Sequence, residues 1–499
     1  MNPKKIKKIL IANRGEIAVR IHRSASEMGI HTVAIFSDAD RRAPHVLNAN
    51  EAYPLNGNLS KDTYLDIQKI IDIAVSSRCD AIHPGYGFLS ENADFVDATT
   101  SAGLLFIGPT SAAMRSMGGK TGARDLMAKA NVPIVPGTTH ALKDFVEAFK
   151  VAQSIGYPVL IKAVHGGGGK GMRRVDRAED LEHALTLAKS ESKSAFGSES
   201  VFIEKYLQNP RHIEIQILAD MHGNTIYLGE RECSVQRRHQ KVVEECPSSV
   251  LTPDIRKKMG EAAVNAARKC GYVNAGTVEF LLDSDKSFYF LEMNTRLQVE
   301  HPVTELVFGL DLVKAQIQIA EGEKLSMTQA QAIPRGHAIE CRIYAEDPFE
   351  GFIPSTGKIE EYIPSEGNGI RHDSGIMPGS EIVHFYDPLL SKLAVWGADR
   401  SEAIRKMKRA LREFKISGVS TTIPFCSFVI DHPKFIDGDY DIHFVEKYYY
   451  PAKLMRSDEE ELVASLAAAS MHNWNTGKGK ENREHTFSSG NWKKKRFDE

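Results

Sequence analysis

The 499-residue sequence lacks an excess of charge, a cysteine pair and a long hydrophobic run. A formal net charge of −2 excludes a global basic field for nucleic acid and an acidic excess for a basic partner, so any anion binding has to be local. Six scattered cysteines without a C-x-x-C pair argue against a disulfide framework or a zinc site. No apolar stretch approaches the roughly 18 residues of a membrane helix, and ILIA near the start is too short for a signal peptide. We therefore expect a cytoplasmic protein that binds neither nucleic acid nor a membrane.

Two common nucleotide-binding fingerprints are also missing. The segment ANRGEIA, which follows the first strand-like run, has one glycine in place of the G-x-G-x-x-G of a dinucleotide site. The glycine run at 166–171 does not end in the Gly-Lys-Ser/Thr of a Walker A loop. A nucleotide would have to be held in another way.

Hydrophobic periodicity divides the chain into α/β segments. Residues 6–36 read as strand, helix and strand, and this alternation continues to LLFIGP, which predicts an open, doubly wound parallel sheet with helices on both faces. From about residue 119 a series of strands follows, and residues 335–447 mix short strands with the basic amphipathic helix SEAIRKMKRALREF. We predict domains at 1–118, 119–330 and 335–447, then a tail at 448–499 that is helical after the SDEE helix start and flexible beyond Met471.

The stretch FLEMNTRLQVEHPVTE carries an unusual polar row. In an unbroken strand, residues two apart share a face, so one face would carry Glu292, Asn294, Arg296, Gln298 and Glu300. The alternative is a solvent-facing edge strand. A hairpin turn at DSDK would place Glu279 beside Glu292, and two facing carboxylates repel unless a cation lies between them. Carboxylate and amide oxygens suit Mg²⁺ or Mn²⁺, and the other end of the row offers an anion clamp and a base.

A metal site of this kind indicates phosphate, and the glycine run agrees with it. Backbone N–H groups at 166–171 could close over a polyphosphate, although such a run is also typical of a flexible turn. Lys162 ends an apolar strand, where a lysine usually meets an anion. Lys120 follows two glycines, with an ordinary surface lysine as the alternative. The cationic segment QRRHQK is either part of the site or a solvated face.

Several segments together resemble the biotin carboxylase family of the ATP-grasp superfamily, over roughly residues 5–447. They are ILIANRGEIAVRI, HPGYGFLSEN, KAVHGGGGKGMRRV, EKYLQNPRHIEIQ, QRRHQKVVEE, EMNTRLQVEHPVTE and GHAIECRIYAEDP. The resemblance implies a central ATP-grasp fold with a mobile glycine-rich lid at about 135–207, and a C-terminal α+β domain. It also implies a ligase that uses ATP and bicarbonate to carboxylate biotin, through carboxyphosphate, with ADP and phosphate as products.

The same resemblance assigns roles by motif position. ATP phosphates would be held by Lys120 and Lys162 under the lid glycines Gly166, Gly167, Gly168 and Gly169. Adenine would be gripped by Glu204, Lys205 and Leu207, in a pocket lined by His212, Gln236 and His239. Two Mg²⁺ or Mn²⁺ ions would be bound by Glu279, Glu292 and Asn294. Bicarbonate would be held by Lys241, Arg296, Gln298 and Val299, with Glu300 as the base, Arg342 at the biotin enolate and Tyr86 in the biotin site.

Two features depart from the family pattern. His165 and Gly119 replace a small residue and an Asp, which puts lid kinetics in question more than activity. The biotin-bearing motif Ala-Met-Lys-Met does not occur. We therefore expect a separate biotin carboxyl carrier protein and carboxyltransferase subunits, together with a homodimer contacted through Arg20 and Arg23. The final acceptor stays open between acetyl-CoA, propionyl-CoA, pyruvate and 2-oxoglutarate.

Two other functions compete with this interpretation. A carbamoyl-phosphate-type ligase shares EMNTRLQVEHPVTE, but HPGYGFLSEN and ECRIYAEDP favour biotin; ammonia dependence would separate the two. A non-catalytic nucleotide-binding regulator would have lost catalytic charges, and every one is present here. Retention of ADP without turnover would favour the regulator.

Overall fold

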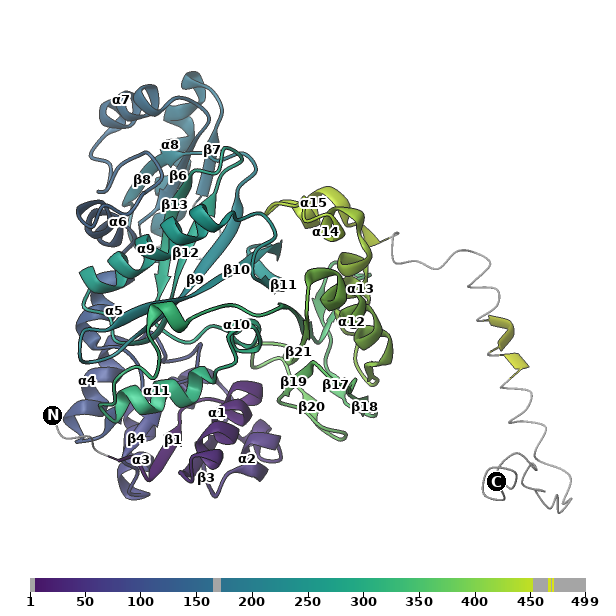
Figure 1. Cartoon of the computed structure of the whole chain (residues 1–499). Helices are drawn as coiled ribbons and strands as arrows, with labels where there is room; N and C mark the ends of the chain where they lie inside the picture. Colours follow the sequence, from purple (N-terminus) through teal and green to yellow (C-terminus); the bar gives the residue numbers. More distant parts are fainter. Residues whose placement is uncertain (1–4, 165–171, 452–464, 468, 471–499) are drawn as a thin grey trace, which may run out of the picture. The chain divides into compact units, whose positions relative to one another are not determined.

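The structure is a computed structural model that describes residues 5–164, 172–451, 465–467 and 469–470 (Figure 1). Residues 1–449 form one compact unit and residues 450–499 a second. The expected helix start at 457–460, the polar segment after Met471 and the lid glycines 166–171 lie outside the described residues. No described helix is both long enough and apolar enough to cross a membrane.

The N-terminal region contains the expected doubly wound parallel sheet. Its five strands run in the order β3-β2-β1-β4-β5, and all of their pairings are parallel. Alternate residues of β1 enter two different cores: Ile9 and Ile11 pack with helix α1 and helix α11 (Leu312–Ala320), and Leu10 packs with α3 and α4. The elements are β1 Lys8–Ile11, α1 Gly15–Glu27, β2 His31–Phe36, α2 Pro44–Asn48, β3 Glu51–Pro54, α3 Ile67–Ser76, β4 Ala81–His83, α4 Ala93–Ser101 and β5 Leu105–Phe106.

A small three-stranded antiparallel sheet, in the order β7-β6-β8, lies within the region expected to form the lid. Its apolar side chains pack against helices α7 and α8 in a core of their own. Glu204 and Lys205 are the last residues of β8, and Lys162 lies on β6. The elements are α5 Ser111–Gly118, α6 Lys120–Lys129, α7 Phe145–Ile155, β6 Val159–Ala163, β7 Met172–Val175, α8 Leu181–Phe196 and β8 Val201–Lys205.

The largest sheet has eight antiparallel strands in the order β13-β12-β9-β10-β11-β14-β21-β19. It crosses the boundary expected near residue 335, because β11 pairs with β14. The central elements are β9 Arg211–Ala219, β10 Thr225–Arg237, β11 Gln240–Cys246, α9 Pro253–Lys269, β12 Asn274–Leu282, β13 Phe288–Asn294, α10 His301–Phe308 and α11 Leu312–Ala320.

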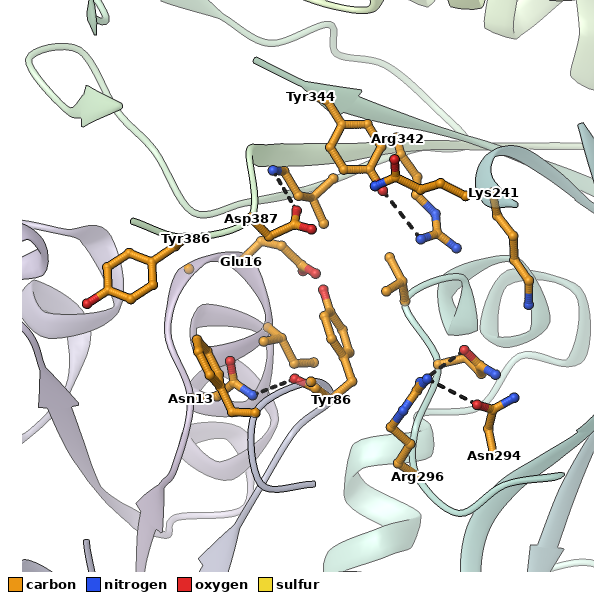
Figure 2. Close-up of a pocket in the computed structure, with 18 of the residues that line it drawn as sticks. Asn13, Glu16, Tyr86, Lys241, Asn294, Arg296, Arg342, Tyr344, Tyr386 and Asp387 are labelled. Atoms are coloured by element: carbon orange, nitrogen blue, oxygen red, sulfur yellow. Dashed lines mark hydrogen bonds between the residues drawn. The ribbon is translucent and has the colours of Figure 1, made fainter. Parts of the chain in front are cut away.

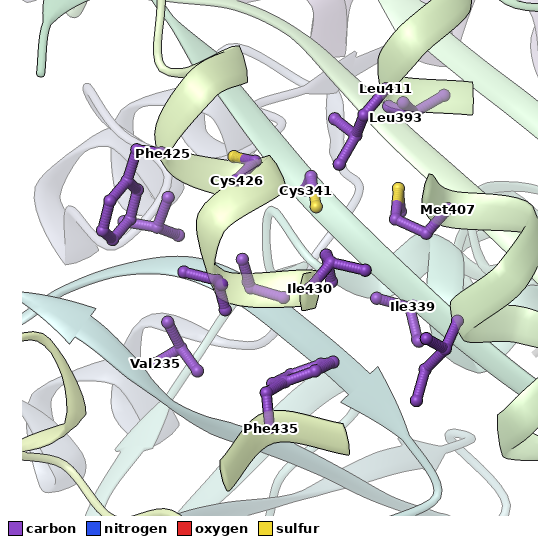
Figure 3. Close-up of a cluster of buried hydrophobic side chains, with 14 of the residues drawn as sticks. Val235, Ile339, Cys341, Leu393, Met407, Leu411, Phe425, Cys426, Ile430 and Phe435 are labelled. Atoms are coloured by element: carbon purple, nitrogen blue, oxygen red, sulfur yellow. The ribbon is translucent and has the colours of Figure 1, made fainter. Parts of the chain in front are cut away.

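The C-terminal part of this sheet separates a hydrophobic face from a charged one. On β14, Ile339 and Cys341 enter the core beneath helices α12 and α13 (Figure 3), whereas the alternating Glu340 and Arg342 belong to the opposite face. The main elements are β14 His337–Tyr344, β19 Ile370–Ser374, β21 Leu389–Gly397, α12 Arg400–Glu413, α13 Ile423–Asp431, α14 Pro433–Ile436 and α15 Phe444–Tyr448. Six short strands form three separate two-stranded sheets, β15-β16, β17-β20 and β18-β22. Their bounds are β15 Glu346–Asp347, β16 Ile353–Pro354, β17 Gly357–Lys358, β18 Tyr362–Ile363, β20 Glu381–Ile382 and β22 Lys415–Ile416.

Candidate active site

A cavity of about 720 Å³ lies where the N-terminal region meets the large sheet. Figure 2 shows Tyr86 on one side of it and Lys241 and Asn294 on the other. The expected site residues that it brings together are Tyr86, His212, Gln236, His239, Lys241, Glu279, Glu292, Asn294, Arg296, Gln298, Val299 and Arg342.

The β12–β13 hairpin places the two carboxylates as expected. Glu279 is the register partner of Glu292, and the turn between the strands includes Lys286 in a left-handed conformation. Burial disfavours the Glu279 anion, but Lys241 and His212 hold the pKa of Glu279 well below its ordinary value. By contrast, desolvation and then the Glu279 charge raise the pKa of Glu292, which is exposed at the cavity. His212, Lys120 and Lys241 oppose this shift but do not overcome it, so cations compensate the charge of Glu292 less fully than that of Glu279.

The oxygen atoms of Glu279, Glu292 and Asn294 fit Mg²⁺ or Mn²⁺. The two carboxylates lie on adjacent strands beside the Asn294 amide, and such hard oxygen atoms are the ligands that these cations prefer. Two other groupings of metal-binding type surround Glu214, which belongs with His212 and Glu279 in one and with Cys233 and Glu300 in the other. The ammonium of Lys241 already lies among the carboxylates of Glu214, Glu279 and Glu300. The positive charge of Lys241 therefore already offsets the negative charge of both groupings.

The expectation of an unbroken polar strand is wrong. Strand β13 ends at Asn294, and residues 295–300 form bends and a turn before α10 begins at His301. The polar groups nevertheless stay together, because Arg296 donates to Asn294 Oδ1 over 3.1 Å and to Gln298 Oε1 over 3.0 Å. Gln298 in turn donates to Glu279 over 3.2 Å. A turn, rather than a pleat, gathers these side chains.

Glu300 is a fully buried carboxylate held by two cations. Lys241 Nζ donates to its Oε1 over 2.8 Å, and Arg342 Nη2 donates to its Oε2 over 2.9 Å. Burial opposes the charge, but Lys241, Arg342 and then Arg231 hold the pKa of Glu300 well below its ordinary value. Glu300 precedes α10 without capping it, so its carboxylate is free for these contacts.

Arg342 contacts a second carboxylate, that of Glu244, in addition to Glu300. Its Nε donates to Glu244 Oε1 over 2.6 Å, while Nη1 lies 3.5 Å from the Tyr344 hydroxyl. Both Arg342 and Tyr344 line the cavity. The Arg342 guanidinium thus bonds the carboxylates of Glu244 and Glu300 at the same time.

A second group of expected residues lies outside this cavity. Lys162 on β6 forms an ion pair with Glu204, which Arg124 also contacts over 3.0 Å. Desolvation, followed by the Lys162 charge, lowers the pKa of Lys120, the first residue of α6. Lys205 Nζ donates to the backbone carbonyls of Gly156 and Tyr157, each over 3.0 Å, and its backbone N–H donates to the Pro136 carbonyl over 2.8 Å. The expected Gly166, Gly167, Gly168 and Gly169 lie outside the described residues, and Leu207 follows β8.

Arg20, expected at a dimer contact, is buried within the chain. Its Nη2 donates to Glu305 over 2.9 Å and lies 3.0 Å from Asp311. Arg23 is half exposed and lies 3.6 Å from Asp373. Arg20 is therefore already engaged inside the chain, and Arg23 is the more accessible of the two.

Sequence reasoning missed several residues at the site. Glu91 accepts from Arg296 Nε over 2.8 Å and from the Thr295 backbone over 3.0 Å, and it belongs to the motif HPGYGFLSEN. Lys392 is a lysine in the apolar strand LLSKLAV, the same signal that singled out Lys162. The missed residues are Asn13, Glu16, Glu91, Glu214, Arg231, Glu244, Glu340, Asp387 and Lys392.

Three protein-family models together match most of the chain. They are "Biotin carboxylase, N-terminal domain" at residues 5–114, "Carbamoyl-phosphate synthase L chain, ATP binding domain" at 119–328 and "Biotin carboxylase C-terminal domain" at 340–447. Biotin carboxylase 1 of Bacillus subtilis is 51% identical over 444 residues, which cover 89% of this chain and 99% of that protein. The biotin carboxylase of Nostoc sp. is 52% identical over 443 residues, with 89% and 99% covered.

Solved structures agree. The biotin carboxylase domain dimer of Hydrogenobacter thermophilus 2-oxoglutarate carboxylase, in complex with MgADP, ADP and bicarbonate, matches with a TM-score of 0.85 at 45% identity, over 91% of this chain and 100% of that chain. The biotin carboxylase subunit of pyruvate carboxylase matches with a TM-score of 0.80 at 46% identity, over 91% and 100%. With its fold, its cavity and these relatives in agreement, the chain belongs to the biotin carboxylase family.

Proposed function

We propose that this chain carboxylates biotin at N1′ with bicarbonate, at the expense of one ATP, and releases ADP and phosphate. The observation that carries the proposal is the position of Glu300. A buried carboxylate lies between Lys241 and Arg342, beside a cavity that Arg296 and Tyr86 also line. A base, an anion clamp and an aromatic wall are thereby combined in one enclosure.

We assign bicarbonate to the charged side of the cavity. Lys241, Arg296 and the Gln298–Val299 segment would hold the anion, and Glu300 would take its proton. The Lys241 contact would pass from Glu300 to the incoming anion, which removes the largest cationic influence that keeps the pKa of Glu300 low. The base would therefore become stronger when its substrate is in place.

We assign ATP to the side formed by Lys120, Lys162 and Glu204, with His212, Gln236 and His239 where it meets the cavity. Lysines near the phosphates offset their negative charge. Glu279, Glu292 and Asn294 would hold Mg²⁺ or Mn²⁺, which when bound screens the phosphate oxygens and orients the polyphosphate.

The carboxylation then balances as follows. The bicarbonate oxygen attacks the γ-phosphorus, the bond to the bridging oxygen breaks, and carboxyphosphate and ADP form. Carboxyphosphate separates into CO₂ and phosphate, and that phosphate accepts the N1′ proton of biotin. The N1′ nitrogen attacks CO₂ while Arg342 stabilises the charge on the ureido oxygen. Enclosure of the site protects carboxyphosphate from water.

The biotin donor and the downstream partners are part of the same proposal. We propose that biotin arrives on a separate carrier protein and that a carboxyltransferase subunit uses the product, which the similarity to biotin carboxylases over 99% of their length supports. The similarity to the biotin carboxylase subunit of pyruvate carboxylase and to a solved biotin carboxylase domain dimer supports a subunit role and a homodimer. The six free cysteines, all among the described residues, support a cytoplasmic location.

ADP formation by the purified chain tests the function. We expect ADP release to require bicarbonate, to rise with free biotin and to ignore ammonia. Stimulation by ammonia without biotin would favour a carbamoyl-phosphate-type ligase, with which the central region shares its family match.

A further inference from the structure

Lys392 is a fully buried lysine whose ammonium reaches the segment that carries the base. It lies on β21, and its side chain is 1% exposed. Its register partners on the two neighbouring strands are Arg342 and Asp373. A buried ammonium is costly unless it is paired and hydrogen-bonded, so its contacts indicate what it is retained for.

The ammonium joins parts of the chain that are distant in sequence. Nζ donates to the backbone carbonyl of Val299 over 2.8 Å and lies 3.3 Å from Glu16 Oε2 and 3.9 Å from Asp373 Oδ2. It also lies 5.8 Å from the centre of the Tyr86 ring. The Lys392 ammonium thus contacts helix α1 through Glu16, the turn before Glu300 through Val299, and the cavity wall through Tyr86.

Close packing fixes the Glu16 side of this junction. A Cβ added at Gly375, just beyond β19, would lie 2.5 Å from the Glu16 backbone nitrogen, so α1 begins directly against the C-terminal strands. Both Glu16 oxygens are buried without a hydrogen-bond partner, which leaves the Lys392 ammonium as their nearest compensating charge. Glu16 is therefore placed to aim Lys392 at Val299.

The Val299 carbonyl lies at a sensitive position. Strand β13 has ended by residue 294, so no sheet pairing holds residues 295–300. Gln298 and Glu300 on either side of Val299 carry the groups assigned to bicarbonate. A shift of this turn by about 1 Å would displace the base and the clamp together, and misplacement of that size can reduce a rate by about 100-fold.

We propose that Lys392 is a positioning residue for the bicarbonate half-site, which fixes the Val299 carbonyl and with it Gln298 and Glu300, and that Glu16 keeps its ammonium in place. The kinetic test of this inference, kcat/KM for bicarbonate, rests on the proposed function. The structural test, hydrogen–deuterium exchange of the turn, is independent of that function.

The test compares Lys392→Met with Arg211→Met. Arg211 is a matched control, since it is a nearly buried cation that donates to a backbone carbonyl, that of Gly438, and lies near a carboxylate, Glu232, and an aromatic ring, Tyr440. We expect Lys392→Met to lower kcat/KM for bicarbonate about 10- to 100-fold and to leave KM for ATP within about threefold. In Arg211→Met we expect no loss of kcat/KM for bicarbonate that exceeds the change in KM for ATP.

Hydrogen–deuterium exchange supplies the readout that is independent of activity. In Lys392→Met, amides of residues 296–301 should exchange about tenfold faster than in the wild type, and in Arg211→Met they should not. If Lys392→Met fails to fold, Glu16→Gln is the second variant, with an expected loss of about fivefold in kcat/KM for bicarbonate. Wild-type protein without bicarbonate-dependent ATPase would refute the proposed function alone. Unchanged exchange at 296–301, or equal losses for bicarbonate and ATP, would overturn the role of Lys392.

Discussion

Oε1 of Glu300 lies 2.8 Å from Nζ of Lys241, and both groups are shielded from solvent. This contact keeps the proposed base ionised but weak, because the cation favours the charged form. The same ammonium is proposed to bind bicarbonate. On this proposal, bicarbonate would draw Lys241 away from Glu300 and so strengthen Glu300 as a base.

Replacing Glu300 by Gln should abolish bicarbonate-dependent ATPase. The amide cannot accept the proton, and loss of a general base typically costs a factor of about 10²–10⁴. ATP affinity, measured by equilibrium binding, should change little, since Glu300 is bonded to Lys241 and Arg342 and not to Lys162. Near-normal turnover would remove Glu300 from its proposed role.

Replacing Lys162 by Gln should weaken ATP binding by about tenfold or more, as expected for the loss of a charge-assisted contact. Its Glu204 partner shows that the ammonium can bind an anion at this position. Lys193→Gln on α8 is the control, because that lysine is exposed and pairs with Glu199. Equal ATP dissociation constants for the two variants would count against the phosphate contact.

Replacing Glu292 by Gln should reduce the affinity for Mn²⁺ in the presence of ADP by about tenfold, since one hard-oxygen charge is lost. Electron paramagnetic resonance of free Mn²⁺ measures this without turnover. Asp285→Asn, in the turn of the same hairpin, should leave Mn²⁺ binding unaltered. Wild-type Mn²⁺ affinity in Glu292→Gln would place the metal elsewhere.

Replacing Glu340 by Gln should make stability less dependent on pH. Glu340 faces Glu244 across β14 and β11, and burial, followed by that neighbouring charge, raises the pKa of Glu340 well above its ordinary value although Lys392 opposes the shift. Above about pH 4.5 the unfolded carboxyl has lost its proton while the folded one keeps it, so the free energy of unfolding falls as pH rises. Gln resembles the protonated acid and cannot titrate. The variant should therefore have a higher Tm than the wild type at pH 9, and a similar one at pH 5.

Glu245, the residue after Glu244, provides the control with the opposite sign. Burial opposes its charge, but His337 and Arg400 lower the pKa of Glu245 to about 2. The stability it contributes is present above its unfolded pKa and is lost as pH falls towards 2. Glu245→Gln should accordingly lower Tm at neutral and alkaline pH. A lower Tm for Glu340→Gln at pH 9 would mean that Glu340 is ionised in the folded protein.

The sequence predicts the β12–β13 hairpin of the site, because alternating residues and turn residues close together in the chain determine it. The DSDK turn sets the register at the end of the hairpin, where Leu282 pairs with Phe288, and a register shift between Phe280 and Glu279 then brings Glu279 opposite Glu292. The predicted extent of β13 was wrong because the strand ends at Asn294 and the chain turns over residues 295–300 before α10 begins at His301. Periodicity cannot show where a strand ends when polar and apolar residues continue to alternate beyond it.

Contacts between segments that are distant in the sequence could not be predicted from hydrophobic periodicity or turn residues. Lys392 and Glu16 meet because strand β21 and helix α1 are packed together by the tertiary fold, and neither segment contains information about the other. The extension of the large sheet through β11 and β14 is of the same kind. Motif resemblance pointed to the residues that we propose contact ligands, whereas the residues packed behind them became visible only in three dimensions.

Transfer of ¹⁸O from labelled bicarbonate tests the central claim most directly. If bicarbonate held beside Glu300 attacks the γ-phosphorus, its attacking oxygen stays on phosphorus when carboxyphosphate separates. Mass spectrometry of phosphate released in unlabelled water should then show one ¹⁸O per phosphate formed in the presence of biotin. Phosphate that takes its new oxygen from water instead would contradict the account.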